Sequence, residues 1–331
     1  MVGVTEFVTG VLLVLLLASF VGPAAAQPPE RMPLVGYISP GSSSDPFRLR
    51  RLEAFRQGLR ELGYVEGRNI ALELRWAEGK YDRYPALAAD LVRLKVHVIV
   101  TVGGAATQAA QRATRTTPII MSVNDPLGSG LVASLARPGG NLTGTSIMAS
   151  DLVGKQLEVF KQAVPEVSRV ALLGNPANPG SAPQLREAEA AARAIRVRLQ
   201  ALEARAPRDI ASAFAAMTRA RAGALIVLAD AIFRNRRKQI ADLAVNSRLP
   251  SVSVIPEYAD AGGFIVYGAD LRDSERRAAV FVDKGLRGAK PGDLPVEQPA
   301  EFDLIIYLKT ARTLGITIAP SVLVRADRVI E

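Results

Sequence analysis

A βαβ pattern occurs twice in this chain, and it constrains the fold more than any other feature. Residues 97–125 read HVIVTVGGAATQAAQRATRTTPIIMSVND, and residues 224–257 read ALIVLADAIFRNRRKQIADLAVNSRLPSVSVIPE. Each passage contains an apolar run typical of a buried strand, a short loop, an amphipathic helix pattern and a second strand led by proline. Each second strand ends on an acid seven residues after its proline, Asp125 in the first copy and Glu257 in the second. The repeat predicts two similar α/β lobes built on parallel sheets.

The position of the two acids indicates where a ligand would bind. In open parallel sheets, ligands lie beyond the carboxyl ends of the strands. Two lobes that face each other across these ends would form a cleft suited to a small molecule. The length of 331 residues allows two such lobes of roughly 130–150 residues each.

The composition excludes several kinds of site. The chain has no cysteine and a single histidine, His97, which rules out disulfides, thiolate sites, a cysteine nucleophile and multi-histidine metal sites. The net charge of +9 comes mostly from arginines on alanine-rich helical segments that also carry acids, without a recognised nucleic-acid-binding motif. We therefore expect no metal, no cofactor and no nucleic-acid partner.

The first residues have the pattern of a targeting segment. Residues 7–21 form an apolar run of about 15 residues, and the small residues Ala24, Ala25 and Ala26 follow it. This pattern predicts a signal peptide over residues 1–26 and a mature chain that begins at Gln27. The first 30 residues contain no lysine or arginine, so a retained anchor and a buried helix stay as alternatives.

The rest of the chain alternates strand and helix patterns. Strands are expected at 34–39, 70–76, 169–174, 197–204, 263–268 and 301–308, and helices at 47–62, 82–94, 151–163, 183–196, 208–220 and 271–287. The alternating polarity of 70–76 predicts a sheet edge. A short helix is expected within the glycine-rich segment 126–144, and the second lobe is expected to begin near 145–150.

Three stretches carry a family resemblance. They are EAFRQGLRELGYVEGRNIALELRWAEGKYDRYPALAADLV at 53–92, NDPLGSGLVASLARPGGNLTG at 124–144 and EFDLIIYLKTARTLGITIAPSVLVRADRVIE at 301–331. Together they resemble the ABC-transporter substrate-binding proteins of the tryptophan/tyrosine-type family. The resemblance implies a type 1 periplasmic binding protein, with two Rossmann-like lobes, a three-strand hinge and a ligand closed in the cleft between them.

The length beyond two lobes indicates that the chain crosses back and adds elements to both. We expect lobe 1 to comprise residues 33–147 and about 269–298, and lobe 2 to comprise 148–268 and about 299–331. The resemblance implies a periplasmic location, a small polar ligand that is amino-acid-like or aromatic, and an ABC permease in the inner membrane as the partner. We expect the protein to be a monomer.

The strongest candidate ligand residues lie at strand ends. Asp125 could bind an ammonium group or a sugar hydroxyl, with a turn or helix cap as its structural alternative. Asp230 and Glu257 occupy the matching strand ends of lobe 2. Backbone N–H groups at a helix start suit a carboxylate, although glycines also make tight turns; these residues are Gly103, Gly104, Ala105, Ala106 and Thr107.

Weaker candidates follow other strands, and a turn or hinge packing explains several of them equally well. They are Ser42, Ser43 and Ser44 after the first strand, and further along the chain Asn175, Tyr258, Tyr267 and Asp270.

Three functions are compatible with such a fold, since a fold alone does not determine function. The leading prediction is a solute-binding receptor that passes its ligand to a permease. A ligand sensor that feeds a signalling partner is the alternative. An enzyme needs an acid–base or nucleophile constellation, and no recognisable arrangement of that kind occurs in the sequence, so we expect no enzymatic activity.

Overall fold

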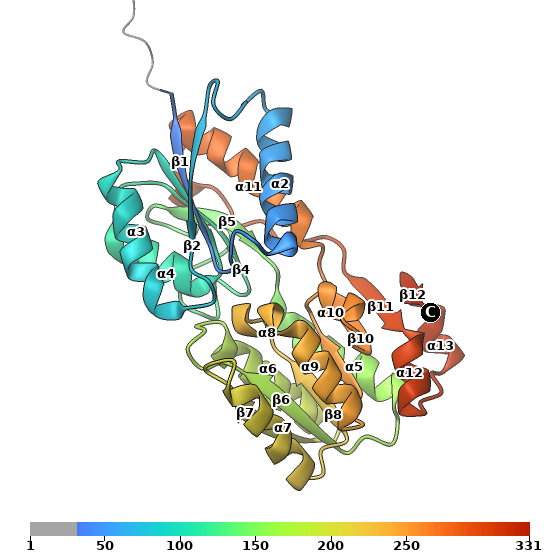
Figure 1. The fold of residues 1–331 in the computed structure, drawn as a ribbon. Coiled ribbons are helices and arrows are strands. Elements are labelled where there is room, and N and C mark those ends of the chain that lie inside the picture. Colours follow the sequence, from blue (N-terminus) through green and yellow to red (C-terminus); the bar gives the residue numbers. More distant parts are fainter. Residues whose placement is uncertain (1–31) are drawn as a thin grey trace, which may run out of the picture. The chain divides into compact units, whose positions relative to one another are not determined.

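A computed structural model describes residues 32–331, which include two β-sheets with helices on their faces (Figure 1). The first sheet has the strand order β2-β1-β3-β4-β5, and all of its pairs are parallel. Its strands are β1 (Leu34–Ser39), β2 (Ala71–Trp76), β3 (Val98–Val102), β4 (Ile119–Val123) and β5 (Leu142–Ser146). The half-buried strand β2 lies at the edge, as its alternating sequence predicts.

Four α-helices belong to this first lobe. They are α2 (Pro46–Glu61), α3 (Tyr84–Arg93), α4 (Gly104–Ala113) and α11 (Leu271–Leu286), together with the short 3₁₀ turns η2 (Tyr81–Arg83) and η3 (Pro291–Asp293). Helix α11 comes from the C-terminal part of the chain and packs against α2 and against β3, β4 and β5. The chain thus returns to the first sheet after it has formed strands of the second.

The second sheet has the order β12-β11-β10-β9-β8-β6-β7. Its strands are β6 (Arg169–Gly174), β7 (Arg198–Glu203), β8 (Ala224–Val227), β9 (Ser251–Ser253), β10 (Ile265–Gly268), β11 (Asp303–Tyr307) and β12 (Arg328–Ile330). Its helices are α5 (Ala149–Ala163), α6 (Ser181–Ala194), α7 (Asp209–Arg219), α8 (Ala231–Asn235), α9 (Arg237–Asn246), α10 (Glu257–Asp260), α12 (Leu308–Leu314) and α13 (Pro320–Leu323).

Most strand pairs of the second sheet are parallel, but β11 runs antiparallel to β10. Strand β11 enters after a crossing from the first lobe. A helix that packs on a sheet between two of its strands normally makes those strands parallel. The helix before β11 is α11, which packs on the first sheet, so no such connection fixes the direction of β11. The prediction of two α/β lobes with parallel sheets is confirmed, with this one strand as an antiparallel addition.

Apolar strands explain why each sheet is covered on both faces. In β3, Val98 and Val100 pack in one cluster beside α2 and α11, whereas Ile99 packs in the other beside α3 and α4. Successive strand residues face opposite sides of a sheet, so a continuous apolar run buries both. The same alternation occurs in β8, where Leu225 and Ile226 belong to different clusters.

One sequence expectation was wrong in the connection between the lobes. Residues 126–141 form turns, and no helix lies between β4 and β5. Strand β5 pairs with β4 at the edge of the first sheet. Its sequence LTGTS lacks an apolar run, and Gly144 is required there: at φ +139°, an added Cβ would lie 2.0 Å from the carbonyl oxygen of Met121.

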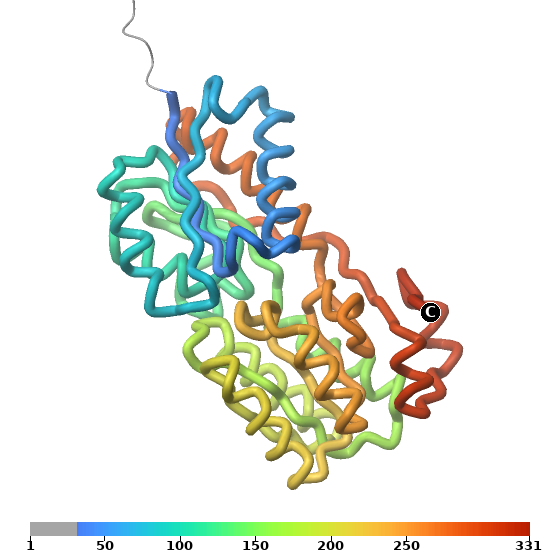
Figure 2. Tube along the Cα trace, in the orientation of Figure 1, coloured from blue at the N-terminus to red at the C-terminus, as the bar shows by residue number. Residues whose placement is uncertain are grey.

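The chain passes between the lobes three times (Figure 2). The crossings lie between β5 and α5, between β10 and α11, and between η3 and β11. This arrangement is the three-strand hinge that the family resemblance implied.

Candidate functional site

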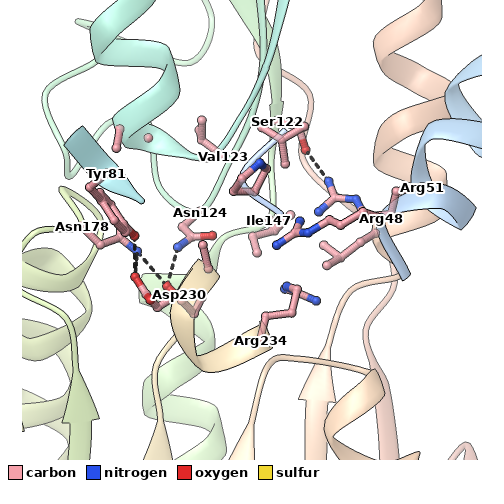
Figure 3. Close-up of a pocket in the computed structure, with 18 of the residues that line it drawn as sticks. Arg48, Arg51, Tyr81, Ser122, Val123, Asn124, Ile147, Asn178, Asp230 and Arg234 are labelled. Atoms are coloured by element: carbon pink, nitrogen blue, oxygen red, sulfur yellow. Dashed lines mark hydrogen bonds between the residues drawn. The ribbon is translucent and has the colours of Figure 1, made fainter. Parts of the chain in front are cut away.

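A cavity of about 60 Å³ lies between the two lobes, beyond the carboxyl ends of their strands (Figure 3). The first lobe lines it with the residues that end β3 and β4, among them Gly103, Ser122 and Asn124. The second lobe contributes Asp230, which follows β8, and Asn178. The cavity therefore has the location that the repeated pattern predicts for a ligand.

Two hydrogen bonds join the lobes at this cavity. The hydroxyl of Tyr81 donates to Oδ2 of Asp230 at 2.6 Å, and Nδ2 of Asn124 donates to the carbonyl oxygen of Ala229 at 2.9 Å. The donors belong to the first lobe and the acceptors to the second. A change in the distance between the lobes would therefore break contacts in the cavity itself.

The Asp230 carboxylate has a full set of hydrogen-bond partners. Oδ1 accepts from the backbone N–H of Ile232 at 2.7 Å and so caps α8. Oδ2 accepts from Tyr81 and from the side-chain amides of Asn175 and Asn178, at 3.2 and 3.1 Å. Burial raises the pKa of Asp230, and these donors lower it in part.

Three buried arginines occupy the other side of the cavity (Figure 3). The guanidinium carbons of Arg48, Arg51 and Arg234 lie 5.3, 5.8 and 4.7 Å from the ring centroid of Phe47. Such distances are typical of cation–π contacts. The site thus has a cationic side, whereas Tyr81, Asn178 and Asp230 line the opposite side.

The three arginines differ in their partners. Arg51 forms a buried ion pair with Glu275 and donates to Ser122 Oγ at 3.2 Å. Arg234 pairs with Glu257 at 2.9 Å. Burial, followed by the charge of Arg51, lowers the pKa of Arg48 to about 10. Burial lowers the pKa of Arg234 to about 9, although Glu257 acts in the opposite direction. All three side chains are protonated at neutral pH.

Several predicted residues lie at this cavity. Asp230 and the loop residues Gly103, Gly104 and Ala105 line it. Gly103, at φ +96°, precedes α4, and no side chain caps that helix. Ala106 and Thr107 are buried in α4, where the Thr107 hydroxyl contacts Thr101 and the carbonyl of Gly103. Asn175 lies behind the lining and reaches it through its hydrogen bond to Asp230.

Asp125 lies outside the cavity. Its Oδ1 accepts from the backbone N–H of Gly128 at 2.7 Å, and its Oδ2 accepts from the hydroxyl of Ser150 at 2.6 Å. These contacts are those of the turn-capping alternative. The carboxylate opens to a separate hollow beside Pro183, and its neighbour Asn124 faces the cavity instead.

Glu257 and Asp270 line another hollow, to which the Phe47 ring also contributes. Glu257 begins α10 and reaches the cavity only through its ion pair with Arg234. Asp270 caps α11 and pairs with Arg272 at 2.8 Å. Asp125 and Glu257 are both at carboxyl ends of strands, but they do not open into one cavity.

The remaining candidates have structural surroundings. Tyr258 is fully buried and donates to Ser251 Oγ at 2.8 Å. The ring of Tyr267 packs 6.3 Å from that of Phe302. Ser42 shares a hydrogen bond with Ser44 and lines a hollow at the rim of the lobes, and Ser43 is exposed.

Sequence reasoning missed most of the charged and polar lining. The missed residues are Arg48, Arg51, Tyr81, Tyr84, Ser122, Asn124, Asn178 and Arg234. One signal could have found the first two. They lie on the buried stripe of α2 with Leu52, Phe55 and Leu59, at helical spacing. An arginine on an apolar stripe needs a counter-charge, a ring or a ligand.

The part of the chain from residue 32 onward contains no cluster of three or more His, Cys, Asp or Glu residues that could hold a metal ion. In the same part, no helix is both long enough and apolar enough to cross a membrane.

Comparison with known proteins gives a consistent picture. The family model for ABC transporter substrate binding proteins matches residues 43–330. The "Tyrosine-binding protein" of Clostridioides difficile (strain R20291) is 26% identical over 263 residues, which are 79% of this chain and 75% of that protein.

Two solved structures are similar throughout. A conserved domain protein from Vibrio cholerae has a TM-score of 0.85 and 26% identity, over 90% of this chain and all of its own. The structure titled as the ABC domain in complex with L-Trp, from Streptococcus pneumonia, has a TM-score of 0.84 and 27% identity, over 90% of this chain and 99% of its own. The resemblance noted in the sequence is confirmed: the chain belongs to the ABC transporter substrate-binding proteins and has the type 1 periplasmic binding fold.

Proposed function

We propose that this protein captures a small amino-acid-like ligand, aromatic ones included, in the cavity between its lobes and delivers it to an ABC permease. The observation that carries the proposal is the cavity itself, which lies at the carboxyl ends of both sheets and has cationic and carboxylate side chains on opposite sides. Support comes from the relatives, one described as binding tyrosine and one solved with L-Trp. Closure of the lobes around the ligand would shift an open–closed equilibrium.

Native mass spectrometry of the refolded protein against a panel of amino acids and aromatic metabolites tests this function. A bound member should add its own mass, and small-angle scattering should then report a smaller radius of gyration. If no member binds, or if a member binds without bringing the lobes together, the receptor function would have to be abandoned.

We propose that the protein acts outside the cytoplasm after removal of residues 1–26. These residues lie outside the part of the chain that the structure describes, and the proposal rests on their apolar run and small-residue ending. Edman sequencing of the exported protein should begin at Gln27, whereas an intact Met1 would favour the retained anchor.

We further propose a monomeric receptor with an inner-membrane permease as its partner and no catalytic role. For such a receptor we propose two lobes, residues 33–147 with about 269–298 and residues 148–268 with about 299–331. The packing of α11 on the first sheet and the pairing of β11 with β10 support this division.

A further inference from the structure

Arg48 differs from every other charged group at the cavity in having no partner. Its side chain is buried, with 4% of the residue exposed. Among residues 32–331, it forms no side-chain hydrogen bond and no ion pair. Its Nε atom is fully enclosed and unbonded. Arg51 and Arg234, which lie against the same ring, are each paired with a glutamate.

The fold makes room for this unpaired side chain. A Cβ added to Gly41 would lie 2.7 Å from Cγ and 2.9 Å from Nε of Arg48. The loop after β1 therefore approaches the arginine so closely that a larger residue at position 41 would require the Arg48 side chain to move. Arg48 lies between this loop and the Phe47 ring, beside the cavity.

A buried charge without an ion-pair partner is costly, because it loses its hydration. The Phe47 ring and the charge of Asp45 offset part of this cost, but Asp45 accepts its hydrogen bond from the backbone N–H of Phe47 and not from Arg48. Arg48 does not escape this cost by losing its proton at neutral pH, since burial lowers its pKa only to about 10. The neighbouring glutamates do not compensate it, because Glu275 and Glu257 bind Arg51 and Arg234. An anionic group that enters the cavity would supply the missing partner.

Asp230, on the opposite side of the cavity, already has hydrogen-bond partners for both of its oxygens. A carboxylate offers about four acceptor sites, and Asp230 accepts hydrogen bonds from Ile232, Tyr81, Asn175 and Asn178. It is therefore satisfied without a cation. The two sides of the cavity are unequal in this respect: the cationic side contains a charged group without an ion-pair partner, and the carboxylate on the anionic side has its partners.

We propose that Arg48 determines the specificity of the cavity for ligands with a carboxylate, and that an α-amino group on the ligand is dispensable. The ligand class is then small carboxylic acids, with amino acids as one subset and their des-amino analogues as another. A guanidinium binds a carboxylate through two parallel N–H donors, which a lysine does not provide. This inference rests on the proposed function, since it assumes that the cavity is the ligand site.

Three matched sets of probes separate the two ligand groups. The amino acids are L-tryptophan, L-tyrosine and L-phenylalanine; the des-amino acids are 3-(indol-3-yl)propionate, 3-(4-hydroxyphenyl)propionate and 3-phenylpropionate; the amines are tryptamine, tyramine and phenethylamine. Calorimetry on the full mature chain measures the affinity for each. The three compounds that share one ring are then compared, for the ring that binds best. The amino acid and its des-amino analogue should have dissociation constants within about tenfold of each other, and the amine should bind at least about 30-fold more weakly.

Variants locate the effect at one residue. Arg48→Met should lower the affinity for the acids by at least about 30-fold, which is the usual consequence of removing one member of a buried hydrogen-bonded charge pair. Arg48→Lys should lower this affinity by a smaller factor, to a value between those of Arg48→Met and the parent. Arg50→Met is the matched control, because Arg50 is an exposed arginine on the same helix; its affinities should equal those of the parent. If Arg48→Met does not fold, Arg48→Lys alone carries the comparison.

The inference is overturned if an amine binds as tightly as its matching acids, if no carboxylate binds, or if the Arg48 variants bind the acids like the parent. Scattering on the same samples separates this failure from that of the receptor function. An amine that binds and closes the lobes would refute the carboxylate requirement and leave the receptor intact. Acids that bind through Arg48 without closing the lobes would support the carboxylate requirement and refute the receptor function.

Discussion

Glu275 is the residue whose replacement tests most directly how α11 is held on the first lobe. Helix α11 follows a strand of the second sheet but packs on α2 and on the first sheet. Glu275 is fully buried in it, pairs with Arg51 of α2 and accepts a hydrogen bond from the Tyr37 hydroxyl at 3.1 Å. Arg51 in turn donates to Ser122 of β4. One carboxylate thus connects α11 with α2, β1 and, through Arg51, β4.

Glu275→Gln keeps the shape of the side chain and an acceptor for Tyr37, but it removes the charge. Arg51 would then lose its ion-pair partner while it still lies beside the charge of Arg48. Breaking a buried pair by removal of one partner costs about 3–5 kcal/mol. Such a loss is a large fraction of the roughly 5–15 kcal/mol by which native proteins are usually stable. Urea unfolding with linear extrapolation measures it, provided that the slope with denaturant is unchanged.

The matched control is Glu61→Gln. Glu61 of α2 pairs with Arg276 of α11 at 2.8 Å, so it joins the same two helices, but both side chains are about half exposed. Because surface ion pairs stabilise proteins little, the urea midpoint of Glu61→Gln should stay close to that of the parent. Arg51→Met combined with Glu275→Leu should recover most of the lost stability, because apolar groups can replace a buried pair. A loss below about 1 kcal/mol for Glu275→Gln would contradict the reasoning.

Three further predictions concern the cavity. Tyr81→Phe removes the hydrogen bond to Asp230 and should favour open lobes by about 1.5–3 kcal/mol; an unchanged radius of gyration of the ligand-free protein would argue against this. Burial raises the native pKa of Asp230, so the native protein binds this proton more tightly than the unfolded chain, and stability should fall as the pH rises from about 3.9 through the raised value. Asp230→Asn should remove that fall in melting curves recorded against pH. Gly41→Ala should displace Arg48 and weaken carboxylate binding by about tenfold in calorimetry, whereas full affinity would mean that the arginine adjusts.

The fold was predictable where burial is two-sided. Strands such as β3 and β8 carry apolar side chains toward both faces, and a continuous apolar run between helix patterns indicates such a strand. Strand β5 has no such signal, because Leu142 is its only large apolar residue and threonine, glycine and serine fill the rest. Its pairing with β4 depends on Gly144, whose close approach to Met121 is a tertiary contact.

The location of the site was predictable, but most of its side chains were not. The fold determines where strands end, so the loop after β3 and Asp230 after β8 line the cavity as predicted. Asp125 also ends a strand, yet its two oxygens bind Gly128 and Ser150. An acid in that position is compatible with a turn cap and with a ligand, and only contacts with distant residues distinguish the two.

Two of the three arginines at the cavity come from helix α2, whose sequence does not resemble a binding motif. Arg48 and Arg51 occupy positions on its buried stripe that an apolar residue would fill in an ordinary amphipathic helix. The stripe remains anchored by Leu52, Phe55 and Leu59, which are all buried against the first sheet. We therefore expect a substitution at Arg48 to change the charge beside the cavity and to leave the strand ends and the crossings between the lobes in place. The strand ends that place the cavity and the unpaired charge beside it are thus specified by different residues of the chain, so charge and scaffold can be varied separately by mutation.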